Sequence, residues 1–115
     1  MITNPARDSL GVQQTTIASS TAETTIVNAA GSGISADLYG LVITNTSSSF
    51  SKVTIKDSTG GTTRFVISVP AQETRGFTVP AIAAVPQLAS NNNWTATCGT
   101  SVANIEITAL FARNI

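Results

Sequence analysis

The chain has 115 residues, with six Lys and Arg against six Asp and Glu, no histidine and a single cysteine. This length is typical of one domain that buries one hydrophobic core, and one cysteine excludes an internal disulfide. No run approaches the roughly 20 apolar residues of a membrane helix, and the cations are scattered singly among acids, so the sequence predicts neither membrane nor nucleic-acid binding.

Charge is scarce. The charged fraction is 10%, against about 25% in ordinary soluble domains. A net charge near zero gives weak protection against association. We therefore expect part of the surface to be buried in an assembly, the alternative being a monomer with a Thr-rich β surface. The N-terminal residues have no apolar signal core, so we expect synthesis in a reducing cytoplasm.

Residues 1–12 predict an extended N-terminal arm, because Asn4-Pro5 and Gly11 interrupt any periodicity. The arm either has no fixed structure or lies across a neighbouring subunit. Residues 13–115 predict a single β-sandwich domain.

Within this domain, short runs rich in β-branched and aromatic residues are each closed by Ser, Gly, Asn or Pro. The expected strands are 13–19, 23–30, 37–46, 52–56, 64–69, a run through Phe77 that ends at Pro80, 94–98 and 104–111. Gly40, inside the third strand, predicts a bulge or a close backbone approach. Residues 80–86 have helical composition but are too short for more than about a turn.

Two hairpins are expected. Residues 57–61 join two alternating runs, and Gly60 and Gly61 supply the positive φ of a tight turn. The last two runs, 94–98 and 104–111, should pair as a closing antiparallel hairpin. About eight short strands without a convincing helix favour an all-β, antiparallel β-sandwich, jelly-roll-like by strand count.

Apolar residues on the inward-facing side of these strands form the expected core. They are Ile26, Leu41, Ile43, Val53, Ile55, Phe65, Ile67, Val69, Phe77, Val79, Trp94, Ala96, Cys98, Ile105, Ile107 and Phe111.

The residues predict no catalytic, cofactor-binding or metal site. Without histidine, the usual general base and nucleophile arrangements are absent. The carboxylates are isolated in sequence, and we expect each to be solvated. Cys98 alternates with Trp94 and Ala96, which favours a core thiol over a reactive one. Trp94 or Tyr39 could stack on a sugar, although one Trp on an alternating strand is more often packed inside.

Three strings carry a resemblance to a known family. They are Leu41-Val42-Ile43-Thr44-Asn45-Thr46-Ser47, Val53-Thr54-Ile55-Lys56-Asp57, and Phe65-Val66-Ile67-Ser68-Val69-Pro70-Ala71 followed by Gly76-Phe77. With the run from Ser20 to Val27, they resemble small structural proteins of tailed-bacteriophage virions. The resemblance implies a β-sandwich or jelly roll that acts as a head decoration or cement protein. Such proteins sit on the outer capsid surface, often as homotrimers, and reinforce the major capsid protein.

A decoration protein needs a contact surface. We expect it at the arm, through Thr3, Asn4 and Arg7, and at one end of the sandwich, through Ser48, Phe50 and Asn92. A tail- or fibre-associated receptor- or carbohydrate-binding module is the alternative, and it would expose Trp94 or Tyr39. An enzyme would need converging carboxylates in a cleft, and we expect none.

Overall fold

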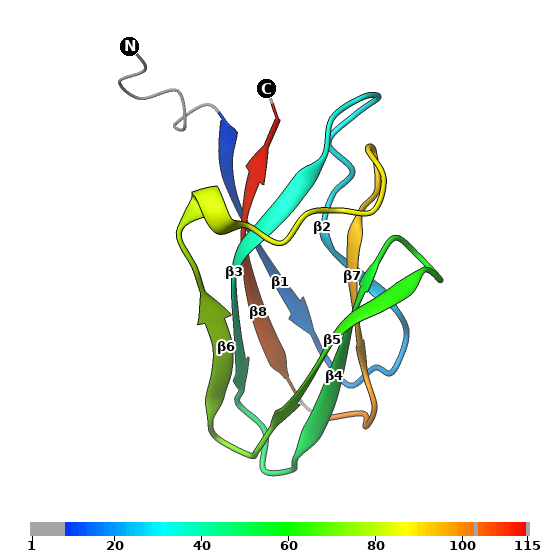
Figure 1. Cartoon of the computed structure of the whole chain (residues 1–115). Helices are drawn as coiled ribbons and strands as arrows, with labels where there is room; N and C mark the ends of the chain where they lie inside the picture. Colours follow the sequence, from blue (N-terminus) through cyan, green and yellow to red (C-terminus); the bar gives the residue numbers. More distant parts are fainter. Residues whose placement is uncertain (1–8, 103, 115) are drawn as a thin grey trace.

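The computed structural model describes residues 9–102 and 104–114. Within them the chain forms eight strands and one short 3-10 turn (Figure 1). The elements are β1 (Leu10–Ile17), β2 (Thr24–Val27), β3 (Ala36–Asn45), β4 (Ser51–Asp57), β5 (Thr62–Val69), β6 (Thr74–Thr78), η1 (Ala81–Ala83), β7 (Trp94–Cys98) and β8 (Ile105–Arg113).

The strands form two four-stranded antiparallel sheets, ordered β1-β8-β3-β6 and β2-β7-β4-β5. Strand β1 pairs with β8, β2 with β7, β3 with β6 and β4 with β5. The chain is thus one long double ribbon, rolled up so that β3 also meets β8 and β4 also meets β7. This is a jelly roll, and the expected all-β sandwich is confirmed.

The predicted closing hairpin is wrong. Strands β7 and β8 lie in different sheets, and the connection between them crosses from one layer to the other. Alternating side chains predict that each run is a strand, but they do not select its partner. Here both strands are central, with partners on either side.

Strand β1 starts earlier than expected, because residues 10–12 pair with β8 instead of belonging to an arm. Gly11, predicted to interrupt the pattern, lies opposite Phe111. A Cβ on Gly11 would overlap the Phe111 ring, so any larger residue at this position would require the ring to move. The predicted contact residues Thr3, Asn4 and Arg7 lie outside the described residues.

The β4–β5 hairpin forms as predicted, with Ile55 opposite Phe65. Its turn uses Ser58 (φ 73°) and Gly60 (φ 68°) for the left-handed positions, so the assignment of positive φ to Gly61 was wrong. The predicted irregularity at Gly40 is confirmed, because the β3–β8 register shifts between Leu38 and Gly40.

Most of the expected core is buried between the sheets, with Trp94 and the inward residues of the four central strands fully enclosed. Five expected members are only half-buried: Phe65, Ile67, Phe77, Val79 and Phe111. Phe65 and Phe77 pack against each other, with ring centroids 5.1 Å apart. Most of these residues belong to β5 and β6, which are edge strands and so have no neighbour to complete their cover. Buried residues that we did not expect include Ile17, Val27, Ala36, Leu38, Val102 and Ala109.

Adjacent residues of β3 test the register. Leu41 is fully buried, whereas Val42 on the opposite face is 37% exposed. Leu41→Ala should lower the free energy of unfolding by about 2–5 kcal/mol because it leaves a cavity, and Val42→Ala should lower it by less than about 1 kcal/mol. Urea denaturation measures both, and similar losses for the two variants would contradict the assigned faces.

Candidate interaction surfaces

Loops gather at the two ends of the sandwich. One end, here called the far end, holds Thr46, Gln72 and Asn104. There the Thr46 N–H donates to Asn104 O at 3.2 Å, and the Gln72 side chain donates to Thr46 O at 3.0 Å. The opposite end, called the terminal end, holds the start of β1, the end of β8 and the residues 28–35, 58–61 and 79–93 (Figure 1).

The expectation that the predicted loops share one end is wrong. Ser48 and Phe50 belong to the β3–β4 loop at the far end, whereas Asn92 belongs to the β6–β7 connection at the terminal end. Strand direction explains the separation, since successive connections of antiparallel strands alternate between the two ends of a sandwich. These residues cannot all form one compact contact.

The β3–β4 loop is fixed by a buried amide. Asn45 is fully buried, and its Nδ2 donates to Ser49 O at 2.7 Å and to Val69 O at 3.0 Å. Its Oδ1 accepts from the backbone N–H of Ser47 at 2.9 Å and from the Ser47 hydroxyl at 2.6 Å. The loop that follows therefore has a defined shape, and it leaves Phe50 51% exposed.

Asp57 is not solvated as expected. It continues the inward face of β4 and is 2% exposed. Its carboxylate accepts from Leu88 N at 2.6 Å, Asn92 Nδ2 at 2.9 Å and Arg64 Nη1 at 3.1 Å. A buried carboxylate requires such donors. Asn92 is half-buried and thus acts inside the fold, holding the long connection.

The connection of residues 79–93 is anchored along its length. Val85 forms a β-bridge with Leu38, and the Gln87 side chain accepts from Ala36 N at 2.7 Å. Arg64 also donates to Pro86 O at 3.0 Å. Before these anchors in the chain, η1 carries Ile82, which is 97% exposed.

Trp94 is a core residue, as the alternation favoured. It is fully buried, and its Nε1 donates to Ala36 O at 2.6 Å. The Arg64 guanidinium lies 5.8 Å from the ring centroid, within range of a cation–π interaction. Trp94 is therefore not available to stack on a sugar, while Tyr39 is half-buried.

Cys98 is a core thiol, as its alternation with Trp94 and Ala96 predicted. It is 1% exposed. Desolvation raises the pKa of its thiol, and a hydrogen bond with Ser51 opposes part of that shift. A buried thiol of this kind is a poor nucleophile.

Two surface carboxylates organise neighbouring elements. The Thr95 hydroxyl donates to Glu23 at 2.6 Å and Gly60 N donates at 3.0 Å, and these bonds, with the charge of Lys56, hold the pKa of Glu23 below its ordinary value. Hydrogen bonds from Thr16 and Gln14 likewise lower the pKa of Glu106. Across the described residues, no group of three His, Cys, Asp or Glu side chains could hold a metal ion.

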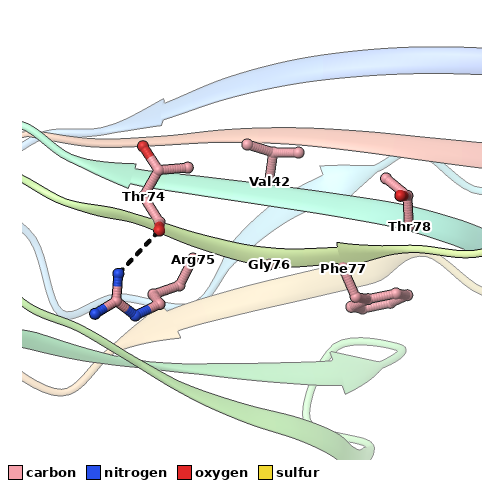
Figure 2. A pocket seen from close by; sticks show the side chains of 6 residues that line it. All are labelled: Val42, Thr74, Arg75, Gly76, Phe77 and Thr78. Atoms are coloured by element: carbon pink, nitrogen blue, oxygen red, sulfur yellow. Dashed lines mark hydrogen bonds between the residues drawn. The ribbon is translucent and has the colours of Figure 1, made fainter.

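An open hollow of about 340 Å³ lies over β6 and its neighbour β3. Figure 2 shows Val42, Thr74 and Thr78 on one side of the sheet and Arg75 and Phe77 on the other. The hollow holds no carboxylate, and its lining is aliphatic, aromatic, hydroxyl and guanidinium.

No protein-family model and no curated protein matches the chain. Among solved structures, it resembles a chain described as PirA with a TM-score of 0.55 and 13% identity, covering 87% of this chain and 92% of that one. It also resembles a chain from the Bacillus endospore appendages, described as disulfide-linked pili, with a TM-score of 0.50, 18% identity and coverage of 91% and 87%. A chain of the extra small virus of the giant freshwater prawn Macrobrachium rosenbergii gives a TM-score of 0.42 at 12% identity, with coverage of 90% and 79%. At these identities, the likeness to the first two structures shows the fold alone. No helix in the described part of the chain is long and apolar enough to cross a membrane.

The buried carboxylate is open to a direct test. Asp57→Ala should lower the free energy of unfolding by about 3 kcal/mol, because Arg64 loses a buried partner. Glu73→Ala is the matched control. It breaks an ion pair with Arg75 whose side chains are 45% and 48% exposed, so its cost should stay below about 1 kcal/mol. Equal denaturation midpoints for the two variants would refute the anchoring role of Asp57.

Glu23 predicts an acid-sensitive contribution to stability. Because the folded state holds its pKa below 4.5, Glu23 stabilises the fold above that pH, and the contribution disappears as pH falls through the folded value. Between about pH 6 and about pH 3, the melting temperature of the Glu23→Gln variant should therefore fall less than that of the wild type. Parallel pH profiles for the two proteins would contradict this assignment.

Proposed function

We propose that this chain is a non-enzymatic structural protein of a tailed-phage virion, and that it decorates the outer surface of the head by binding the major capsid protein. The strand motifs from Leu41 to Phe77 support the proposal through their resemblance to phage structural proteins. The jelly roll and the scarcity of charge are compatible with it. The protein would be made in the cytoplasm of the host bacterium and then join the virion.

The observation that carries the proposal is the far-end loop. The buried Asn45 side chain fixes its backbone by donating to Ser49 O and accepting from Ser47 N–H, and the loop leaves Phe50 half exposed. An aromatic side chain on a rigid loop makes a good anchor, because little conformational entropy is lost on binding. Ser48, beside it, is exposed and available for hydrogen bonding.

Decoration of this kind acts through burial. An interface of about 1,600 Å² is a standard size for a specific complex. Where copies also contact one another, each bound copy strengthens the attachment of its neighbours. A charged fraction of 10% lowers the cost of burying the surface, since few charges have to be desolvated.

The carbohydrate-binding alternative is less well supported. It was expected to expose Trp94 or Tyr39, and Trp94 is enclosed in the core. Tyr39 is half-buried on β3, away from the far-end loop. The homotrimer expected from the resemblance stays a prediction.

The far-end loop is tested by binding to purified heads that lack the decoration protein. Phe50→Ser should weaken binding by about tenfold or more, because it removes the anchor ring. Val66→Ser is the matched control, since Val66 is 55% exposed on the outer face of β5, and it should bind as the wild type does. Both variants should melt like the wild type. Unchanged binding of Phe50→Ser would exclude the loop as the contact.

The same assay tests the predicted arm. Removal of residues 1–8 leaves β1 intact, since β1 starts at Leu10. If Thr3, Asn4 and Arg7 anchor the protein, the shortened chain should fold normally and no longer co-sediment with heads. Full binding by the shortened chain would rule out the arm as an anchor.

A further inference from the structure

Strand β6 is the edge of its sheet and pairs with β3 alone. Val79 N–H donates to Tyr39 O at 2.8 Å, and Glu73 O accepts from Asn45 N at 2.9 Å. In an antiparallel ladder every second residue bonds to the same neighbour. The odd-numbered residues from 73 to 79 therefore bond toward β3, and the even-numbered ones direct their N–H and C=O groups to the open edge.

The even-numbered residues are Thr74, Gly76 and Thr78, and all three are exposed. A Cβ on Gly76 would overlap the carbonyl oxygen of Leu41, so this position requires glycine. As a result, the backbone at the centre of β6 has no side chain to shield it. The strand also pairs with β3 without a register shift, and a regular edge of this kind is a template for another strand.

The side of the sandwich formed by β5 and β6 is incompletely covered. Phe65 and Ile67 on β5, and Phe77 and Val79 on or beside β6, are core-facing yet half-buried. The hollow shown in Figure 2 opens along the same strand. An added strand at β6 would cover these apolar side chains. It would also form hydrogen bonds with the backbone N–H and C=O groups at the open edge of β6.

The sequence of β6 is complementary to itself. We propose that β6 pairs antiparallel with β6 of a second copy, with Gly76 opposite Gly76 across a two-fold axis. Thr74 then faces Thr78 of the other copy on the outer side of the sheet, where Thr pairs stabilise. Arg75 faces Phe77 on the inner side, in a pair without backbone hydrogen bonds, which brings side chains closest. The guanidinium can then lie on the ring.

Other registers fit less well. A pair centred on Arg75 sets the two guanidinium groups directly opposite each other, which is destabilising. A pair centred on Phe77 sets Thr74 opposite Pro80, which has no N–H to donate. In the proposed register the two copies of Arg75 are diagonal neighbours and not directly opposite. The charge of each is neutralised by Glu73 of the same copy, whose Oε1 lies 2.5 Å from Arg75 Nη2.

This contact is independent of head binding, because it uses the β6 edge and not the far-end loop. It is also compatible with a trimer, since pairs of β6 strands would join copies from neighbouring trimers. A net charge of zero offers no repulsion against it.

Cysteine cross-linking tests the register in the purified chain without heads. Thr74→Cys in one copy and Thr78→Cys in the other would place the two Cα atoms about 5.5 Å apart, within disulfide range. Two copies of the same single variant would place their cysteines about 13 Å apart along the strands. Mild oxidation of the two single variants mixed together should therefore yield a covalent dimer, and oxidation of either variant alone should not. The native Cys98 is buried and should not compete.

A second measurement follows self-association by sedimentation equilibrium. Arg75→Glu should raise the dissociation constant by about tenfold or more. Lys52→Glu is the matched control, because it makes the same charge change at an exposed position on β4 and should leave the constant unchanged. The proposal is overturned if the mixture yields no cross-link, if single variants cross-link as readily as the mixture, or if both charge variants behave alike.

Discussion

Two central strand pairs, β3 with β8 and β4 with β7, hold the rolled ribbon closed. Each joins a strand from the first half of the chain to one from the second, so neither sheet exists until distant segments meet. Their inward side chains, from Leu41 and Ile43 across to Val53, Ile55 and Ile107, fill the space between the layers. Trp94 closes the terminal end of this core, and its indole N–H finds a buried acceptor in Ala36. In such a topology most of the stabilising contacts are long-range, which predicts slow folding relative to helical domains of this size.

Local sequence predicted the strands well and their partners poorly. Alternation within Lys52–Lys56 and Trp94–Cys98 reports which side chain faces inward, and the structure agrees. The same alternation carries no information on which strand lies alongside, so β7 and β8 were wrongly joined. Gly11 was misread because a glycine that breaks a pattern and a glycine that makes room for a ring look identical in sequence. Asp57 was misread because its three donors come from β5 and from the β6–β7 connection, which only the fold brings together.

The surface divides into parts with different physical character. At the far end, buried hydrogen bonds hold a short polar loop beside an exposed aromatic ring, as suits recognition of a foreign surface. Along β6, bare backbone and a short self-complementary sequence suit recognition of an identical copy. The sequence analysis found Phe50 from its position in a loop, but it placed Asn92 in the same surface because loop order along the chain does not reveal the end of the sandwich. The hollow at β6 left no signal in the sequence except Gly76, whose role depends on the carbonyl group of a neighbouring strand.

Strands β1 and β8 pair with Leu10 opposite Ala112, so the chain leaves its last strand at the terminal end, away from Phe50. A protein fused after β8 would therefore extend from the side of the sandwich opposite the far-end loop. If that loop faces a capsid, the fused domain would face the solvent in as many copies as the capsid carries. The same strand order that builds the core would thus make the chain a carrier for displaying other proteins on a particle surface.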